Sequence, residues 1–270
     1  MSKILFIVEG SKTEQMLVEN MNKVIFYNLE LEVISLSYAC NIYDLWITLK
    51  NDEFETDIIE VIKEKHKHEI AYNKKFKDLS VDEYSEVYLF FDYDGHQTNL
   101  PIEVDGDKVI REMLHTFDNE TELGKMLISY PMVEAIKDFN ELNGICFRCV
   151  ADAYKNVHYK RQLHDLTDFQ DIRKLTSMNW SKIIHIFLTR CKCLFSFKQL
   201  DDYYSHEVTP ISIFEMQYEN FLKLHKKVLV LSAFPEFLLD YFGKKILERI
   251  SVDDCYEYNN TENCEWRQNV

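Results

Sequence analysis

The stretch ILFIVEGSKTEQMLV, residues 4–18, decides the fold. Five consecutive apolar residues, mostly β-formers, end abruptly in Glu9 and a glycine, which is typical of a buried strand that stops at a tight turn. The segment that follows begins like a helix, and Ser11 or Thr13 is available to cap its free amides. Strand, turn and helix in this order predict an α/β protein, and they place Glu9 and Glu14 at the carboxyl end of the strand, where such proteins carry their chemistry.

A second pair of carboxylates follows another predicted strand and indicates a shared site with the first pair. The stretch YLFFDYDG, residues 88–95, is another apolar run, and it ends in Asp92, Asp94 and a turn-permitting glycine. Because parallel strands end at one edge of a sheet, neighbouring strands would bring these acids together with Glu9 and Glu14. Such crowding is unfavourable unless cations neutralise it, and clusters of oxygen ligands suit Mg²⁺ or Mn²⁺. In the simpler alternative, Glu14 only complements a helix dipole and Glu9 faces solvent.

The rest of the N-terminal half alternates between strands and helices. Apolar or alternating runs predict further strands at 31–36, 87–91 and 125–130. Helical spacing or start signals predict helices over 42–49, over 56–77 and from Pro131 through Ala135. Strands separated by helices indicate a parallel sheet with right-handed crossovers.

Beyond residue 150 the pattern becomes mainly helical. Apolar residues recur at helical spacing over 180–188, 213–224 and 237–250, and 226–231 is either a strand or a helix end. We therefore expect an α/β domain over 1–145, a mainly helical region packed on it over 146–252, and a polar tail over 253–270.

Charge is distributed unevenly along the chain. Residues 1–150 hold 15 Lys and Arg against 29 Asp and Glu, whereas the remainder holds 16 against 17. A protein that coats duplex nucleic acid by charge alone needs a basic surplus, and this chain has a net charge of −15. A nuclease is compatible with the composition, because bound divalent cations reverse the local field of a carboxylate-lined site.

Signals for a membrane or for export are missing from the sequence. The N-terminus lacks the basic and apolar pattern of a leader, and no uninterrupted apolar run is long enough to span a bilayer. We therefore expect a cytoplasmic protein without a membrane partner.

The two acidic motifs resemble those of the Toprim domain, the metal-binding α/β fold of topoisomerases, bacterial primases, recombination proteins and OLD-family nucleases. The spacing within IVEGSKTE is similar to the EGxxTE signature of RloB-type proteins. Over roughly residues 1–140 the resemblance implies a mostly parallel four-stranded sheet flanked by helices. It makes Glu9 the general acid/base or metal-linked glutamate, and Asp92 and Asp94 metal ligands. The stretch LISYPMVEAI is also similar to bacterial proteins of this type and adds Glu134 as a further acidic member.

The resemblance implies a Mg²⁺- or Mn²⁺-dependent nuclease that acts on DNA or RNA. The sequence contains no GxxxxGK[ST] motif of an ATPase, and the helical remainder fits neither a topoisomerase tyrosine domain nor the zinc and polymerase parts of a primase. We therefore expect an effector of a bacterial or phage-encoded defence system, working with a separately encoded ATPase or another defence-system protein. Lys12, in the first turn, and His96, after the second motif, are candidates for contacting a substrate phosphate.

Two other functions stay open. FFDYDGHQT is also similar to the opening motif of haloacid-dehalogenase-type phosphatases, in which Asp92 would be the phosphoryl-accepting nucleophile and Asp94 the acid/base. Ser232 and Lys244 follow in the order of that family, but they stand too close together for the intervening βα units, and the first acidic motif has no role there. Alternatively, the chain is a noncatalytic sensor or interaction protein that retains the Toprim fold.

Overall fold

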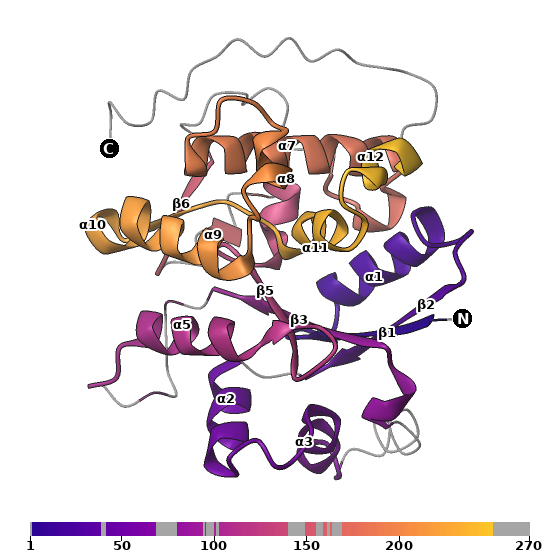
Figure 1. Ribbon diagram of the computed structural model, residues 1–270, viewed down its shortest axis with the longest axis vertical. Coiled ribbons are helices and arrows are strands. Elements are labelled where there is room, and N and C mark those ends of the chain that lie inside the picture. Colours follow the sequence, from indigo (N-terminus) through magenta and orange to yellow (C-terminus); the bar gives the residue numbers. More distant parts are fainter. Residues whose placement is uncertain are drawn as a thin grey trace.

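The structure, a computed structural model, is layered around one mostly parallel β-sheet (Figure 1). It describes residues 2–38, 42–68, 80–93, 95, 100, 103–139, 149–154, 159–160, 163 and 169–250. Asp94 and His96, both predicted for the site, lie outside the described residues, as do the expected domain boundary at 145 and the expected tail over 253–270.

Five strands form the sheet in the order β2–β1–β3–β5–β4. Their bounds are Ser2–Val8 for β1, Leu31–Ser37 for β2, Glu86–Asp92 for β3, Asp118–Asn119 for β4 and Gly124–Ser129 for β5. The four longer strands are parallel, whereas β4 pairs antiparallel with β5. The α/β class and the mostly parallel sheet are confirmed, but the expected number of four strands is wrong. β4 was missed because two residues are too few to form a periodic pattern.

The two strands that carry the acidic motifs lie side by side in the middle of the sheet. The segments Ile4–Val8 and Val87–Phe91 are entirely buried. Strands covered on both faces of a parallel sheet read as continuous apolar runs, which is why both were recognisable in the sequence. Val8 is opposite Phe90 in the register, so β1 and β3 end at the same edge.

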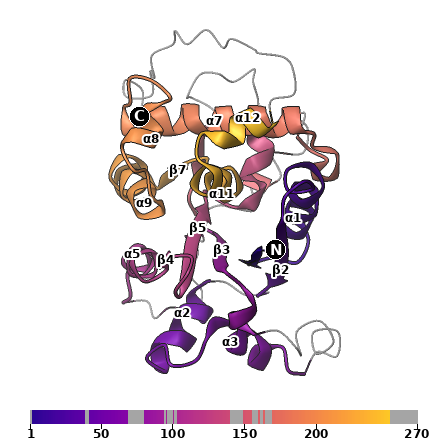
Figure 2. The same cartoon turned by 45° about the vertical axis from the view of Figure 1, so that its right-hand side comes forward.

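Helices cover both faces of this sheet (Figure 1 and Figure 2). α1 and α11 lie on one face, and α2, α3 and α5 lie on the other. The bounds are Thr13–Val24 for α1, Ile42–Asn51 for α2, Ile58–Lys65 for α3, Gly106–Thr116 for α5 and Ala233–Phe242 for α11. The helix predicted over 56–77 is present as the shorter α3, and residues 69–79 lie outside the described part of the chain.

The C-terminal region is mainly helical, with the long helix α7 outside α11 (Figure 1). Its elements are β6 Val150–Asp152, η6 Ile172–Lys174, α7 Ser177–Phe195, α8 Asp202–Ser205, α9 Pro210–Gln217, the π-helical turn η7 Tyr218–Leu222, α10 Lys223–His225, β7 Lys227–Leu229 and α12 Lys245–Ile250. The single helix predicted over 237–250 is wrong, because Gly243 takes a positive φ of 58° and separates α11 from α12. The ambiguous segment 226–231 forms β7, which pairs with β6.

Among the helices in the described ranges, none combines the length and the apolar character that a bilayer crossing needs.

Aromatic side chains join α11 to the sheet. The ring centroid of Phe237 lies 4.7 Å from those of Phe6 on β1 and Tyr88 on β3. One turn earlier, Phe234 stacks on Phe90 at 4.7 Å between centroids. Offset and edge-to-face contacts of this kind add to the energy of burying the rings. The C-terminal region therefore supplies part of the core that covers the sheet.

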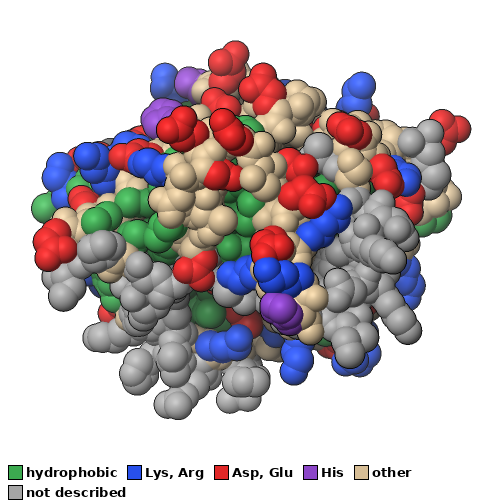
Figure 3. Space-filling model, turned by 90° about the horizontal axis from the view of Figure 1, so that it is seen from below, with side chains coloured by type: hydrophobic (Ala, Val, Ile, Leu, Met, Phe, Trp, Pro, Cys, Tyr) green, Lys and Arg blue, Asp and Glu red, His purple; other side chains and the backbone are tan. Residues whose placement is uncertain are grey.

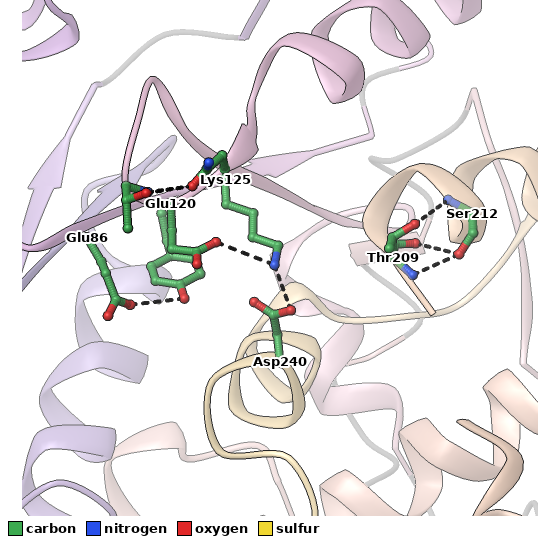
Figure 4. A network of polar contacts seen from close by, with 9 residues as sticks. Glu86, Glu120, Lys125, Thr209, Ser212 and Asp240 are labelled. Atoms are coloured by element: carbon green, nitrogen blue, oxygen red, sulfur yellow. Dashed lines mark hydrogen bonds and ion pairs between the residues drawn. The ribbon is translucent and has the colours of Figure 1, made fainter. Parts of the chain in front are cut away.

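A polar network surrounds the same junction (Figure 4). Nζ of Lys125, on β5, lies 2.7 Å from a carboxylate oxygen of Asp240 on α11 and 3.6 Å from one of Glu120. The same view shows Thr209 and Ser212, which exchange backbone-to-side-chain hydrogen bonds that cap α9. The lysine therefore ties β5 to α11, the helix whose aromatic rings cover the centre of the sheet.

We expect Phe237→Ala to lower the free energy of unfolding by about 3–5 kcal/mol, because it removes a fully buried ring and leaves a cavity between α11 and the sheet. Tyr27→Ala is the matched control, since Tyr27 is 69% exposed and its loss should change that energy by less than about 0.5 kcal/mol. Urea unfolding of both variants measures the difference. Equal losses would contradict the packing of α11 on the sheet.

Candidate functional site

The carboxyl ends of β1 and β3 hold the first two acidic residues. Glu9 follows β1, and its backbone N–H donates to the carbonyl oxygen of Phe90 at 3.1 Å. Its side chain turns toward β3, where Oε2 accepts a 3.0 Å hydrogen bond from the backbone N–H of Asp92. The expected adjacency of the two strands is confirmed. The alternative in which Glu9 only faces solvent is wrong, because its carboxylate binds the backbone of β3.

Asp92 links the end of β3 to the segment that follows β5. Its Oδ1 accepts a 2.7 Å hydrogen bond from the backbone N–H of Val133. Val133 begins a short 3₁₀-helix, η2, over Val133–Asp138. The helix predicted to open at Pro131 is thus a 3₁₀-helix that starts two residues later, and Asp92 binds an N–H group at its free amino end.

Glu14, in the first turn of α1, is buried against the turn before the helix. Only 5% of this residue is exposed, and its Oε1 accepts a 2.8 Å hydrogen bond from the N–H of Gly10. A Cβ at Gly10 would stand 2.7 Å from both carboxylate oxygens, so the glycine makes the close approach possible. The predicted capping by Ser11 or Thr13 is wrong. Lys12 is the N-cap, its side chain makes no capping bond, and Glu14 folds back onto the turn instead.

Glu134, on η2, is the fourth acidic residue at this edge. Its Oε1 lies 2.5 Å from Nζ of Lys160 and receives a long contact of 3.5 Å from the hydroxyl of Thr13. Its Oε2 is buried and has no hydrogen-bond partner among the described residues. Lys160 was missed by sequence reasoning, since it stands in a region without a motif or a clear periodicity.

Neighbouring carboxylates raise the pKa values of Asp92 and Glu14. Burial raises the pKa of Asp92 well above its ordinary value of 3.8, and the negative charges of Glu9, Glu14 and Glu134 raise it further. Burial is also the largest cause of the raised pKa of Glu14, to which Glu134 adds, while backbone hydrogen bonds and Lys160 oppose the rise. The acidic residues therefore form one electrostatic unit, which we call the acidic cluster: Glu9, Glu14, Asp92 and Glu134.

The remaining predicted site residues are placed only in part. Lys12 is exposed in the turn between the two glutamates of the first motif. Asp94 and His96 fall outside the described residues, so their predicted roles stay predictions. Within the described ranges, no group of three or more His, Cys, Asp and Glu residues is placed to hold a metal ion. The acidic cluster is thus a set of neighbours with individual hydrogen bonds, not a closed ligand shell.

The residues named for the phosphatase alternative have structural partners. Ser232 is fully buried, and its hydroxyl oxygen accepts a 3.4 Å hydrogen bond from the N–H of Phe234, which caps α11. Lys244 lies 3.1 Å from a carboxylate oxygen of Asp201. Both side chains are accounted for by contacts other than Asp92.

A cavity of about 490 Å³ lies between α2 and α3 and does not belong to the acidic cluster. It is lined by residues of the two helices and their connecting loop together with Tyr38, and by none of the four clustered carboxylates. Figure 3 looks at the molecule from the end that carries α2 and α3, and it shows acidic and basic side chains interspersed over that face. The described side chains on this face are therefore of mixed charge.

Comparison of the chain with protein-family models, with curated proteins and with solved structures gave no match.

We expect Asp92→Asn to raise the melting temperature of the metal-free protein. The change removes one charge from among three other carboxylates, while an amide oxygen can still accept the hydrogen bond from Val133. A carboxyl whose pKa is raised in the folded protein stabilises the fold at low pH, and this contribution is lost as the pH rises from the ordinary 3.8 through the raised value. The gain from Asp92→Asn should therefore be larger at about pH 8 than at about pH 5.

Thermal unfolding in EDTA at the two pH values measures this effect. Each kcal/mol of relief corresponds to about 2–4 °C for a chain of this size. Asp82→Asn, at an exposed position, is the control and should leave the melting temperature unchanged at both pH values. If the two variants behave alike, the carboxylates do not repel one another as their placement indicates.

Proposed function

We propose that the protein is a metal-dependent nuclease that hydrolyses phosphodiester bonds of DNA or RNA at the acidic cluster. One observation carries the proposal: four carboxylates from three segments of the chain gather where β1 and β3 end, and three of them raise the pKa of the fourth. Clusters of like charge with strongly shifted pKa values are found mainly at functional sites of proteins. The likeness of both motifs to those of Toprim domains supports the same reaction.

The donor chemistry of the cluster fits Mg²⁺ or Mn²⁺. All four side chains offer carboxylate oxygens, and Oε2 of Glu134 is buried with an unused acceptor. Mg²⁺ in proteins is commonly held by one or two carboxylates, water molecules and substrate phosphates, so a set of three direct protein ligands is not required. Asp92 and Glu134, with Glu9, Glu14 and Asp94, are the residues that would hold the ion. When bound, it would polarise the phosphoryl oxygen and lower the pKa of its water.

Glu9 is the residue best suited to move a proton. Its Oε2 is held by the N–H of Asp92, so the carboxylate is oriented along the edge where the two strands end. The residue is only partly buried, which leaves it accessible from the edge of the sheet. An oriented carboxylate in this position can take a proton from attacking water or return one to the leaving oxygen.

Binding of a nucleic acid requires positively charged side chains, and acidic residues outnumber basic ones in the N-terminal half of the chain. Lys12 is exposed beside the cluster, and with His96 it is our candidate for a phosphate contact. We assign the remaining substrate affinity to the C-terminal region or to a partner protein. The likeness to RloB-type and OLD-family motifs supports a role as an effector of a bacterial or phage-encoded defence system, with a separately encoded ATPase as a candidate partner.

We expect Glu9→Gln to lower cleavage by a factor of about 10²–10⁴, because it keeps the size of the side chain and removes its ability to act as acid or base. Glu19→Gln is the matched control, since Glu19 is exposed on α1 and its loss should leave cleavage unchanged. Plasmid, linear and single-stranded DNA and tRNA are incubated with Mg²⁺ or Mn²⁺ and each variant, with and without products of neighbouring genes.

The assay separates the three functions. Cleavage that Glu9→Gln abolishes and Glu19→Gln spares supports the nuclease. Release of phosphate from small phosphomonoesters that survives Glu9→Gln but not Asp92→Asn indicates the phosphatase. No activity on any substrate, with any partner added, would refute the nuclease and leave the noncatalytic sensor.

A further inference from the structure

An ammonium group of the protein itself reaches the acidic cluster. Nζ of Lys160 lies 2.5 Å from Oε1 of Glu134. The two side chains differ in exposure, since 57% of the lysine side chain is exposed but only 5% of the glutamate side chain is. The lysine therefore approaches a buried carboxylate from the solvent side.

The backbone beside Lys160 is anchored to the same short helix that carries Glu134. The hydroxyl of Tyr159, which is a buried residue, donates a 3.1 Å hydrogen bond to Oδ2 of Asp138 at the end of η2. Arg190 donates a 2.9 Å hydrogen bond to the backbone carbonyl of Asp138 and so fixes this end of η2 against α7. The contact between Lys160 and Glu134 is thus set by buried neighbours, unlike a chance pairing of two exposed side chains.

Lys160 satisfies only one of the two carboxylate oxygens of Glu134. Lys160 forms an ion pair with Glu134, which is a member of the acidic cluster. It engages Oε1 of Glu134, whereas the buried Oε2 is left without a hydrogen bond. A buried carboxylate oxygen without a partner is unfavourable, and a divalent cation could bind both oxygens at once.

We propose that Lys160 is a tethered counter-cation, which occupies the position beside Glu134 in the metal-free protein and is displaced when a divalent cation binds the acidic cluster. The inference rests on the proposed function only in requiring that the cluster binds Mg²⁺ or Mn²⁺. Because the lysine side chain is more than half exposed, its ammonium can return to water at little cost. Metal and lysine then compete for one carboxylate, and each weakens the binding of the other by the same factor.

The first test is the affinity for Mn²⁺, measured by calorimetry or by electron paramagnetic resonance without any substrate. Lys160→Met keeps an unbranched apolar stem and removes the charge, so the dissociation constant for Mn²⁺ should fall about 2- to 10-fold. Lys160→Arg keeps the charge and should retain most of the competition. Lys137→Met is the control for a general change in charge, since it removes a lysine from η2 itself, and it should have a smaller effect.

The second test asks whether the effect passes through Glu134. In a Glu134→Gln background the Lys160→Met change should no longer tighten Mn²⁺ binding, because the competing charge pair has already been removed. In EDTA, Lys160→Met should lower the melting temperature of the otherwise unaltered protein, and it should have little effect in the Glu134→Gln background.

The outcomes distinguish this inference from the proposed nuclease. Tighter Mn²⁺ binding by Lys160→Met, absent in the Glu134→Gln background, supports the counter-cation even if no nucleic acid is cleaved. An unchanged dissociation constant beside normal Mn²⁺ binding overturns the counter-cation and leaves the nuclease standing. Failure of every variant to bind Mn²⁺ overturns both.

Discussion

The parallel pairing of β1 with β3 is the constraint on which the acidic cluster depends. Its register sets Val8 opposite Phe90. Just beyond that pair, the backbone N–H of Asp92 holds the carboxylate of Glu9 in place. A slip of one residue in this pairing would move Glu9 along β3, away from the N–H of Asp92 that holds its carboxylate. The apolar core therefore fixes the position of the charged groups, although it makes no contact with a ligand.

Three of the clustered carboxylates accept hydrogen bonds from backbone N–H groups around the end of the sheet. Glu9 receives an N–H from β3, Asp92 receives one from η2, and Glu14 receives one from the turn before its own helix. Hydrogen bonds to the ionised form favour it, while burial and the neighbouring acids favour the protonated form. The edge of the sheet is thus held by polar contacts whose strength depends on the charge state of the cluster.

The sequence was most informative where burial is continuous. β1 and β3 could be recognised because strands covered on both faces are apolar at every interior position, and the acids that end them were visible for the same reason. β4 could not be found, since two residues carry no period, and the break at Gly243 was missed because apolar residues recur at helical spacing on both sides of it. The capping of α1 was predicted wrongly: Lys12 is the N-cap and makes no side-chain capping bond, and Glu14 accepts the N–H of Gly10 in the turn before the helix. Contacts such as that of Lys160 with Glu134 join distant segments of the chain, and no local pattern encodes them.

The position of α11 in the chain has a consequence for biosynthesis. The last parallel strand, β5, ends at Ser129, whereas the helix that covers the centre of the sheet begins at Ala233. At about 5–20 residues per second, a ribosome needs roughly 5–20 s to make the intervening chain. During that interval the rings of Phe6, Tyr88 and Phe90 lack the helix that buries them, so the growing chain carries an open apolar surface that chaperones can bind.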